Sequence, residues 1–244
     1  MSSLPGTTGR RRIYLMRHGH VDYFSKEVVD SQDPRLARLT AQGEEQARTA
    51  GEALSDIAFD IAMCSGLRRT RETAELVLSR QSGEPPVLEN EPRLEELRSG
   101  QYIAFESREQ LAATMTFQFE NAGAPDASFF EGGERFADAM SRVETAISDL
   151  LSRPNWHTAL VVAHEGINRL ALSWMCQAPL HASASFEQDT GCINILDFDL
   201  VPEDDGKQNR IERRIIKSIN LTPMNYVKHG MNLRSLEAIF SRDD

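Results

Sequence analysis

Hydrophobic and polar positions follow two alternating patterns from residue 12 to about residue 175. Short continuous apolar runs at residues 13–16, 61–64 and 159–163 are separated by longer segments whose apolar residues recur at helical spacing. Continuous apolar runs between helical segments are typical of parallel strands joined by crossover helices. The pattern therefore predicts an α/β fold, with a mostly parallel central sheet and helices on both faces.

Four helices are predicted between these strands. Thr40 is a candidate N-cap for the first, because its side-chain oxygen can accept a hydrogen bond from the first turn. Gly133 and Glu134 open the third, which continues as an apolar stripe to the break at residues 153–155. The predicted ranges are 40–57, 67–78, about 134–152 and about 167–176.

The remaining segments change the pattern without requiring a second domain. Alternating apolar positions in 193–198 and 211–219, on either side of a polar turn at 202–209, predict a hairpin at an antiparallel edge of the sheet. Residues 99–131 carry mixed signals and predict a helical cap insertion. The tail at 220–244 has apolar residues that pack either on the rest of this chain or on a second copy of it. The sequence therefore does not decide between a monomer and a homodimer. We expect residues 1–244 to form a single domain.

Composition and charge narrow the partners and the compartment. The 244 residues are 40% hydrophobic and 26% charged, as in ordinary globular proteins, and the net charge of -10 disfavours nucleic acid and anionic membranes as partners. No run approaches a membrane span of about 20 apolar residues, and no apolar segment precedes the first strand, so we expect a cytoplasmic protein. Cys64, Cys176 and Cys192 are predicted to be core thiols, and Arg10–Arg12 to be a solvated terminus.

Cationic and nucleophilic side chains follow the three apolar runs. In an open α/β sheet, the ends of the strands are where the ligand crevice forms. Arg17 and Arg69 have planar guanidinium groups, whose paired N–H donors can bind two oxygens of a phosphate. A neutral histidine can attack phosphorus, a protonated one can stabilise the transition state, and a carboxylic acid can protonate the leaving oxygen. We assign these three roles to His18, His164 and Glu96.

Two alternatives compete with these assignments. His18-Gly19-His20 has the His-x-His form of some metal hydrolases. The other histidines offer poor support as further ligands, so we favour a site without metal and place His20 at the substrate rim. Glu91 and Glu95 compete with Glu96 for the role of the acid.

The motifs occur in an order that resembles one protein family. Arg17-His18-Gly19 at the end of the first strand resembles the signature of the histidine phosphatase superfamily, the phosphoglycerate-mutase-like proteins. Further matching motifs cover most of residues 12–198. They are Leu39-Thr40 with Gly43, Gln46 and Ala47; Ser65, Leu67, Arg69, Thr73 and Ala74; Leu94, Glu96 and Gly100; Gly132-Gly133-Glu134; and residues 161–166.

The resemblance implies a fold, a reaction and a set of roles. It implies that His18 is the phosphorylated nucleophile, that Arg17, Arg69 and His164 hold the phosphate, and that Glu96 is the proton donor. The loop at 190–192 resembles a family loop whose backbone touches the phosphate, which adds Gly191. No metal or other cofactor is implied. The expected substrate is a small phosphorylated metabolite, and the expected activity is that of a histidine acid phosphatase-type hydrolase.

The chain also departs from the family pattern. After Arg-His-Gly the family commonly has an acidic residue, then Thr or Ser, and later Asn, where this chain has His20, Val21 and Phe24. Residues 101–105 lack the pattern of phosphoglycerate mutases. A phosphatase is therefore the favoured interpretation. A phosphoglycerate-type mutase and a low-turnover phosphate-binding or scaffold relative remain the alternatives.

Overall fold

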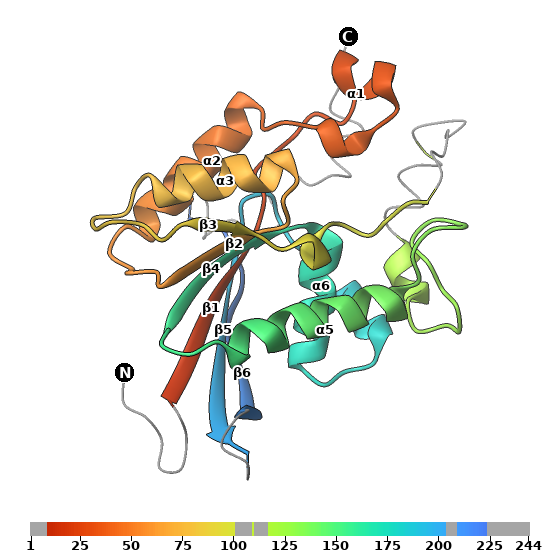
Figure 1. Ribbon diagram of the computed structural model, residues 1–244. Helices are drawn as coiled ribbons and strands as arrows, with labels where there is room; N and C mark the ends of the chain where they lie inside the picture. Colours follow the sequence, from red (N-terminus) through yellow and green to blue (C-terminus); the bar gives the residue numbers. More distant parts are fainter. Residues whose placement is uncertain (1–8, 101–108, 110–116, 204–208, 224–244) are drawn as a thin grey trace.

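One mixed sheet forms the centre of the computed structural model, which describes residues 9–100, 109, 117–203 and 209–223 (Figure 1). The strand order is β3-β2-β4-β1-β5-β6. The first four of these strands are parallel, and β5 and β6 are antiparallel to their neighbours. The strands are β1 (Gly9–Arg17), β2 (Ile61–Cys64), β3 (Leu88–Asn90), β4 (Thr158–Ala163), β5 (Ile193–Pro202) and β6 (Asn209–Leu221).

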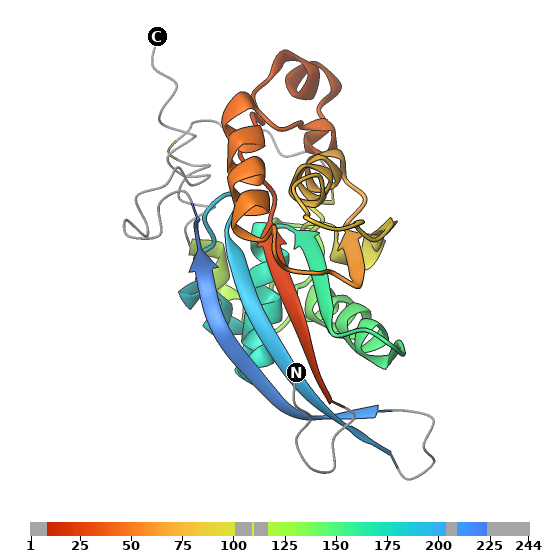
Figure 2. The ribbon, with the colours of Figure 1, turned by 90° about the vertical axis from the view of Figure 1, so that its left-hand side faces the viewer.

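Helices cover both faces of this sheet, as predicted. In Figures 1 and 2, α2 and α3 lie on one side of the strands, and α5 and α6 lie on the other. Thr40 is the N-cap of α2, since its hydroxyl oxygen accepts from the backbone N–H of Gly43. The α-helices are α1 (Lys26–Ser31), α2 (Ala41–Ala53), α3 (Arg68–Leu78), α5 (Phe136–Ser152) and α6 (Glu165–Met175). Short 3₁₀ turns are η1 (Pro34–Leu36), η2 (Pro92–Leu94), η3 (Gln118–Asn121) and η4 (Leu180–Ser185).

Strand β1 shows how the sheet builds two cores. Successive side chains of a strand point to opposite faces. Ile13 and Leu15 therefore belong to the core beneath α5 and α6, whereas Tyr14 and Met16 belong to the core beneath α2 and α3. Because both faces are buried, the strand is a continuous apolar run.

The register of the sheet brings the predicted chemistry to one edge. Arg17, the last residue of β1, is paired with Ala163, the last residue of β4. His18 and His164 therefore leave adjacent strands at the same level. Ser65 follows β2 on the other side of β4, where its N–H donates to the carbonyl of Val162.

The basic run at residues 10–12 is part of strand β1, which corrects the prediction of a solvated terminus. Arg10 and Arg12 form ion pairs with the buried carboxylates of Asp199 and Asp197 on the neighbouring strand β5. Arg11 is buried on the other face, with its guanidinium over the ring of Trp156. Arg10 and Arg12 favour this pairing of β1 with β5, because their partners lie directly opposite them in the register.

One further prediction is wrong, two short elements were not predicted, and two expected segments lie largely outside the described residues. Cys176 is exposed just after α6, so the prediction of a core thiol is wrong there, whereas Cys64 and Cys192 are buried as predicted. The short β3 and α1 were not predicted. Of the expected cap at 99–131, residues 101–108 and 110–116 lie outside the described residues, as does the tail from residue 224 onward. The described part of the cap contains η3, whose Phe119 packs against Phe129 and Phe136.

Candidate active site

The two predicted histidines lie together at the ends of β1 and β4. Their ring centroids are 5.2 Å apart, and the rings meet edge to face at 66°. His18 is 1% exposed and His164 is fully buried. The sheet register thus places two imidazoles from distant parts of the sequence in one pocket.

The hydrogen bonds of His18 define its reactive atom. Its Nδ1 lies 2.7 Å from the carbonyl oxygen of Gly19, which can only accept, so Nδ1 carries the proton. The Nε–H of Arg69 points at Nε2 of His18 from 3.2 Å, so Nε2 presents a lone pair. Burial lowers the pKa of His18 well below its usual value, and Arg69 and Arg17 lower it further. The ring is therefore a neutral nucleophile with Nε2 as the attacking atom.

Close backbone packing fixes the loop that carries His18. A Cβ on Gly19 would stand closer than van der Waals contact to the carbonyl of Gly43 in α2, so only glycine permits this approach. The N–H of Gly19 donates to Thr73 of α3. The next residue, His20, donates its N–H to Gln46, and its ring nitrogen Nδ1 lies 2.8 Å from the hydroxyl of Thr40. His20 is half-buried at the edge of the pocket, and its contact with substrate stays a prediction.

A relay of hydroxyl groups orients His164. Thr70 donates to the carbonyl of Leu67, so its oxygen accepts from the hydroxyl of Ser65 at 2.9 Å. The Ser65 oxygen then accepts from Nε2–H of His164 at 2.8 Å. This direction leaves Nδ1 of His164 as the buried ring atom without a hydrogen-bond partner among the described residues. Burial, Arg69 and His18 lower the pKa of His164 well below its usual value.

Both predicted arginines reach the same pocket and are buried. Arg69 contacts His18, donates to the carbonyl of Pro34 and lies over the ring of Tyr23. Arg17 is held by the backbone carbonyl of Gln188 and by an ion pair with Glu165. In contrast, Arg68 lies at the surface in an ion pair with Glu72, as the spacing from Ser65 predicted.

Glu96 lies beside the start of α6 as a partly buried carboxyl group. Its two oxygens accept from the N–H groups of Leu97, at 3.0 Å, and of Gly166, at 3.2 Å. A Cβ on Gly166 would come within 2.6 Å of one of these oxygens, so this glycine lets the carboxyl group approach the helix. Burial raises the pKa of Glu96, and nearby Glu165 raises it further, against the two backbone donors that lower it. The group is therefore suited to carry a proton.

The competing glutamates are engaged elsewhere. Both carboxylate oxygens of Glu91 accept hydrogen bonds from the guanidinium group of Arg93, and these bonds lower the pKa of Glu91. Glu95 is ion-paired with Arg35. The geometry therefore favours Glu96 over both as the acid.

Arg142 of α5 holds the segment that carries Glu96. It donates to the backbone carbonyls of Glu95 and Glu96, and its fork is paired with the carboxylate of Glu134. Arg142 was not predicted as a site residue from the sequence. The Gly132-Gly133-Glu134 motif was recognised, but its partner eight residues later was not distinguishable from a surface arginine.

Gly191 lies in the loop beside the nucleophile at a positive φ of 74°. Its N–H donates to the backbone carbonyl of His18 at 3.1 Å, so the loop supports the segment that carries the nucleophile. Direct contact of Gly191 with phosphate stays a prediction.

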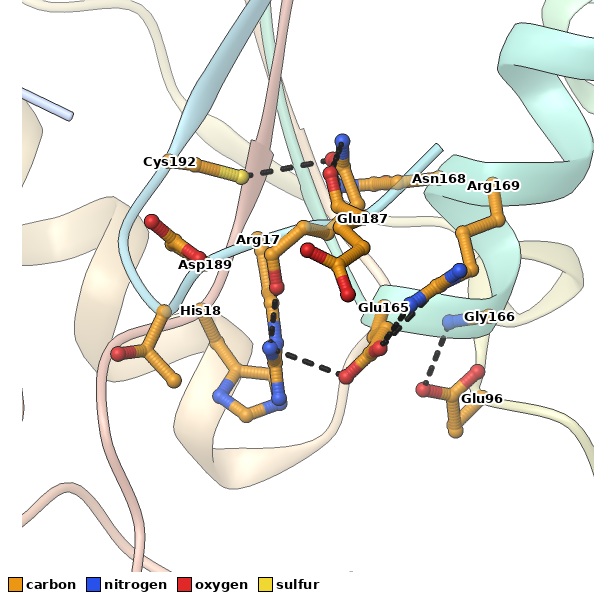
Figure 3. Close-up of polar contacts among 12 residues, drawn as sticks. Arg17, His18, Glu96, Glu165, Gly166, Asn168, Arg169, Glu187, Asp189 and Cys192 are labelled. Atoms are coloured by element: carbon orange, nitrogen blue, oxygen red, sulfur yellow. Dashed lines mark hydrogen bonds and ion pairs between the residues drawn. The ribbon is translucent and has the colours of Figure 1, made fainter. Parts of the chain in front are cut away.

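Glu165 is a second residue that the sequence analysis missed. Its carboxylate lies 3.0 Å from Arg17 and 2.8 Å from Arg169, so it links two arginines that are 152 positions apart (Figure 3). Its position directly after His164 indicated that Glu165 lies near the pocket. The sequence did not show that its carboxylate faces Arg17 and Arg169.

Among the residues that the structure describes, no group of three or more His, Cys, Asp or Glu side chains is arranged to hold a metal ion. No helix in the described part of the chain is long and apolar enough to cross a membrane.

The fold and the paired histidines and arginines define the class of this protein. The family model of the histidine phosphatase superfamily (branch 1) matches residues 13–202, and the chain belongs to this family.

Curated relatives of known name share about a quarter of their residues with this chain. The adenosylcobalamin/alpha-ribazole phosphatase of Escherichia coli is 28% identical over 187 residues, which is 77% of this chain and 90% of the relative. The probable phosphoglycerate mutase GpmB of Enterobacter sp. is 26% identical over 78% of this chain and 86% of its own length. A solved mycobacterial glucosyl-3-phosphoglycerate phosphatase in complex with VO3 has 22% identity and a TM-score of 0.65, covering 86% of this chain and 99% of its own, and so supports the fold.

Proposed function

We propose that this protein is a metal-independent phosphomonoesterase that hydrolyses a small phosphorylated metabolite through a phosphohistidine on His18. The observation that carries the proposal is the neutral His18 ring, whose Nε2 lone pair lies beside Arg69 and next to His164. Family membership supports this reading. The name of the Escherichia coli relative, an alpha-ribazole phosphatase, supports a small phosphorylated metabolite as substrate.

The phosphate is held by the groups around His18. Arg17 and Arg69 supply positive charge to its oxygens, which is the main requirement of phosphoryl transfer. Nδ1 of His164 has no hydrogen-bond partner in the described part of the chain, so it is suited to take up a proton and donate it in a hydrogen bond to the phosphate. A phosphate dianion favours that protonation, because it offsets the influence of the neighbouring arginines on His164.

The first step transfers the phosphoryl group to the enzyme. The Nε2 lone pair of His18 attacks phosphorus, and the ester P–O bond breaks with its electron pair on the leaving oxygen. Glu96 donates its proton to that oxygen, so the alcohol leaves neutral. The products of this step are phosphohistidine and a Glu96 carboxylate.

The second step returns the enzyme to its starting state. Glu96 accepts a proton from water as the water oxygen attacks phosphorus. The P–N bond breaks, its electron pair returns to Nε2 of His18, and inorganic phosphate is released. No oxidant, reductant or metal enters this balance.

A panel of phosphomonoesters assayed for phosphate release, with and without a chelator, tests the proposal. We expect turnover that is insensitive to chelator and almost abolished in His18→Ala. The control is His157→Ala, which removes an exposed histidine far from the pocket and leaves the rate unchanged. Loss of activity with chelator and its return with a divalent ion would favour a metal enzyme instead.

Rapid quenching tests the covalent step. We expect a phosphoenzyme that is labile to acid and stable to base, and its absence under single-turnover conditions would contradict the mechanism. Two other outcomes identify the alternatives. Transfer to a second hydroxyl that needs a bisphosphorylated primer indicates a mutase, which the GpmB relative keeps as the runner-up. Phosphate binding without turnover indicates a scaffold.

A further inference from the structure

Glu165 places a fixed carboxylate in the pocket, and this carboxylate neither makes nor breaks a bond in the proposed reaction. One carboxylate oxygen lies 3.0 Å from Nη1 of Arg17, and the other accepts from Nη2 and Nε of Arg169 at 2.8 and 3.2 Å. Figure 3 shows the side chain reaching from the first turn of α6 toward both guanidinium groups. Ion pairs on both oxygens favour the charged form of this carboxyl group.

Arg169 prevents this carboxylate from moving away. Its Nη1 donates to the backbone carbonyls of Ser183 and Ala184, and its guanidinium lies 4.7 Å from the ring centroid of Phe119. The two carbonyls belong to η4 and the ring belongs to η3, so contacts from two different segments leave the side chain little rotational freedom. Glu165 is therefore held as a rigid negative charge.

The carboxylate also lies on the side of the pocket where the leaving group must be. Gly166, the residue after Glu165, donates its N–H to the carboxyl group of Glu96, so the two acids share the start of α6. In the view of Figure 3, the Glu165 carboxylate lies between Arg17 and Glu96. The side chain of Glu165 is 20% exposed and that of Arg17 is 3% exposed, so the carboxylate is the more accessible member of the pair.

We propose that Glu165 is a specificity-determining residue, whose fixed carboxylate selects phosphomonoesters with a cationic or uncharged group near the ester oxygen and rejects those with a carboxylate there. This inference rests on the proposed function, because it places the leaving group beside Glu96. Its physical cause is Coulombic. In a partly buried site, removing one unit charge near the leaving group changes the affinity for a charged substrate by more than about tenfold.

Three two-carbon substrates test the inference because they differ only at the end remote from phosphate. They are 2-aminoethyl phosphate (cationic), 2-hydroxyethyl phosphate (neutral) and phosphoglycolate (anionic). We expect kcat/KM to fall in that order for the wild-type enzyme. In Glu165→Gln, the ratio of the cationic to the anionic substrate should shrink by at least about tenfold. Comparing this ratio between enzymes cancels the intrinsic difference in leaving-group reactivity.

Two variants separate charge from structure. Glu165→Asp keeps the charge and should keep the wild-type order of substrates. Glu44→Gln is a matched control, because Glu44 also lies in the first turn of its helix and forms an ion pair with an arginine four residues later, but on the opposite side of the sheet from α6. It should leave the ratio unchanged. An equal fall for all three substrates in Glu165→Gln, or loss of the order in Glu165→Asp, overturns the inference.

A binding measurement distinguishes this inference from the proposed function. The non-hydrolysable 2-aminoethylphosphonate and phosphonoacetate carry the same two end charges, and calorimetry gives their affinities without turnover. We expect wild type to favour the cationic compound and Glu165→Gln to lose at least about tenfold of that preference. If none of the three esters is hydrolysed but this shift is observed, the proposed function fails and the inference on charge selection stands. If the esters are hydrolysed and the shift is below twofold, the inference fails alone.

Discussion

At the scale of single residues, the candidate site sets the protonation of two groups by their surroundings. Burial beside Arg69 and Arg17 lowers the pKa of His18, which keeps the nucleophile neutral. Burial and the charge of Glu165 raise the pKa of Glu96, which favours the protonated form of the acid. Both shifts favour the proposed chemistry, because environments that push two pKa values apart assign the base and acid roles.

These two shifts predict the pH dependence of the reaction. Activity needs neutral His18 and protonated Glu96, so kcat/KM should be high between the two pKa values. On acidification the rate should persist through the usual pKa of histidine and fall only well below it. On alkalisation it should fall as Glu96 loses its proton, at a higher pH than an ordinary glutamate would. A pH profile that falls on acidification near pH 6.5 contradicts the neutral, buried state of His18.

Glu96→Gln removes the proton donor while keeping the size of the side chain. We expect kcat to fall by about 10² to 10⁴ for alkyl phosphates, whose leaving oxygen needs a proton. The loss should be much smaller for 4-nitrophenyl phosphate, because nitrophenolate leaves without one, and the alkaline limb of the profile should disappear. Steady-state assays of both substrates measure this. An equal loss for both would assign the proton transfer to another group.

At the scale of elements, the site depends on how helices hold loops. Arg142 of helix α5 holds the segment after η2 by donating to the backbone carbonyls of Glu95 and Glu96. The two carboxylate oxygens of Glu134 accept hydrogen bonds from Nε and Nη2 of Arg142 and so hold its guanidinium group in place. A planar guanidinium can make these contacts together, and an ammonium group cannot.

Arg142→Lys tests this role. We expect kcat to fall by about tenfold or more with KM little changed, because Glu96 loses its position while phosphate binding is untouched. Loss of several hydrogen bonds should also lower the free energy of unfolding by about 1–3 kcal/mol. Arg135→Lys is the matched control, since Arg135 forms exposed ion pairs with Asp126 and Asp138 at the same end of the helix. Equal kinetic losses in the two variants would contradict the positioning role.

At the scale of the whole molecule, the pocket joins segments from all parts of the chain. Its side chains follow β1, begin α3, follow η2 and begin α6, so the pocket exists only when the sheet and both helix layers are assembled. A ligand that binds this pocket binds the native state and stabilises the complete fold.

Inorganic phosphate should therefore raise the melting temperature. At about 100 times its dissociation constant, binding contributes about 2.7 kcal/mol, which corresponds to roughly 5–10 °C for a chain of this size. Differential scanning calorimetry measures the shift. Arg69→Gln should lose most of it, because one of the two phosphate-binding guanidinium groups is gone. An undiminished shift in that variant would place the phosphate elsewhere.

Local pattern was sufficient to predict the central architecture and the main candidate residues. The buried strands are continuous apolar runs, and His18 and His164 directly follow two of them, so the end of the sheet was a predictable meeting point. The short β3 could not be predicted, because its three residues, Leu88–Asn90, are too few to show a hydrophobic period. It is a strand because it pairs with β2, which is a tertiary contact.

The amino-acid sequence by itself determined the long strands, the long helices and the order of the motifs, because apolar spacing reflects which faces each segment must bury. Only the tertiary structure decided which charges face each other. Arg12 meets Asp197 across 185 positions, and Arg17 meets Glu165 across 148. Such pairs leave no local periodicity, since an ion pair depends on distance in space. For that reason the roles inferred for Glu165 and Arg142 emerged from the fold.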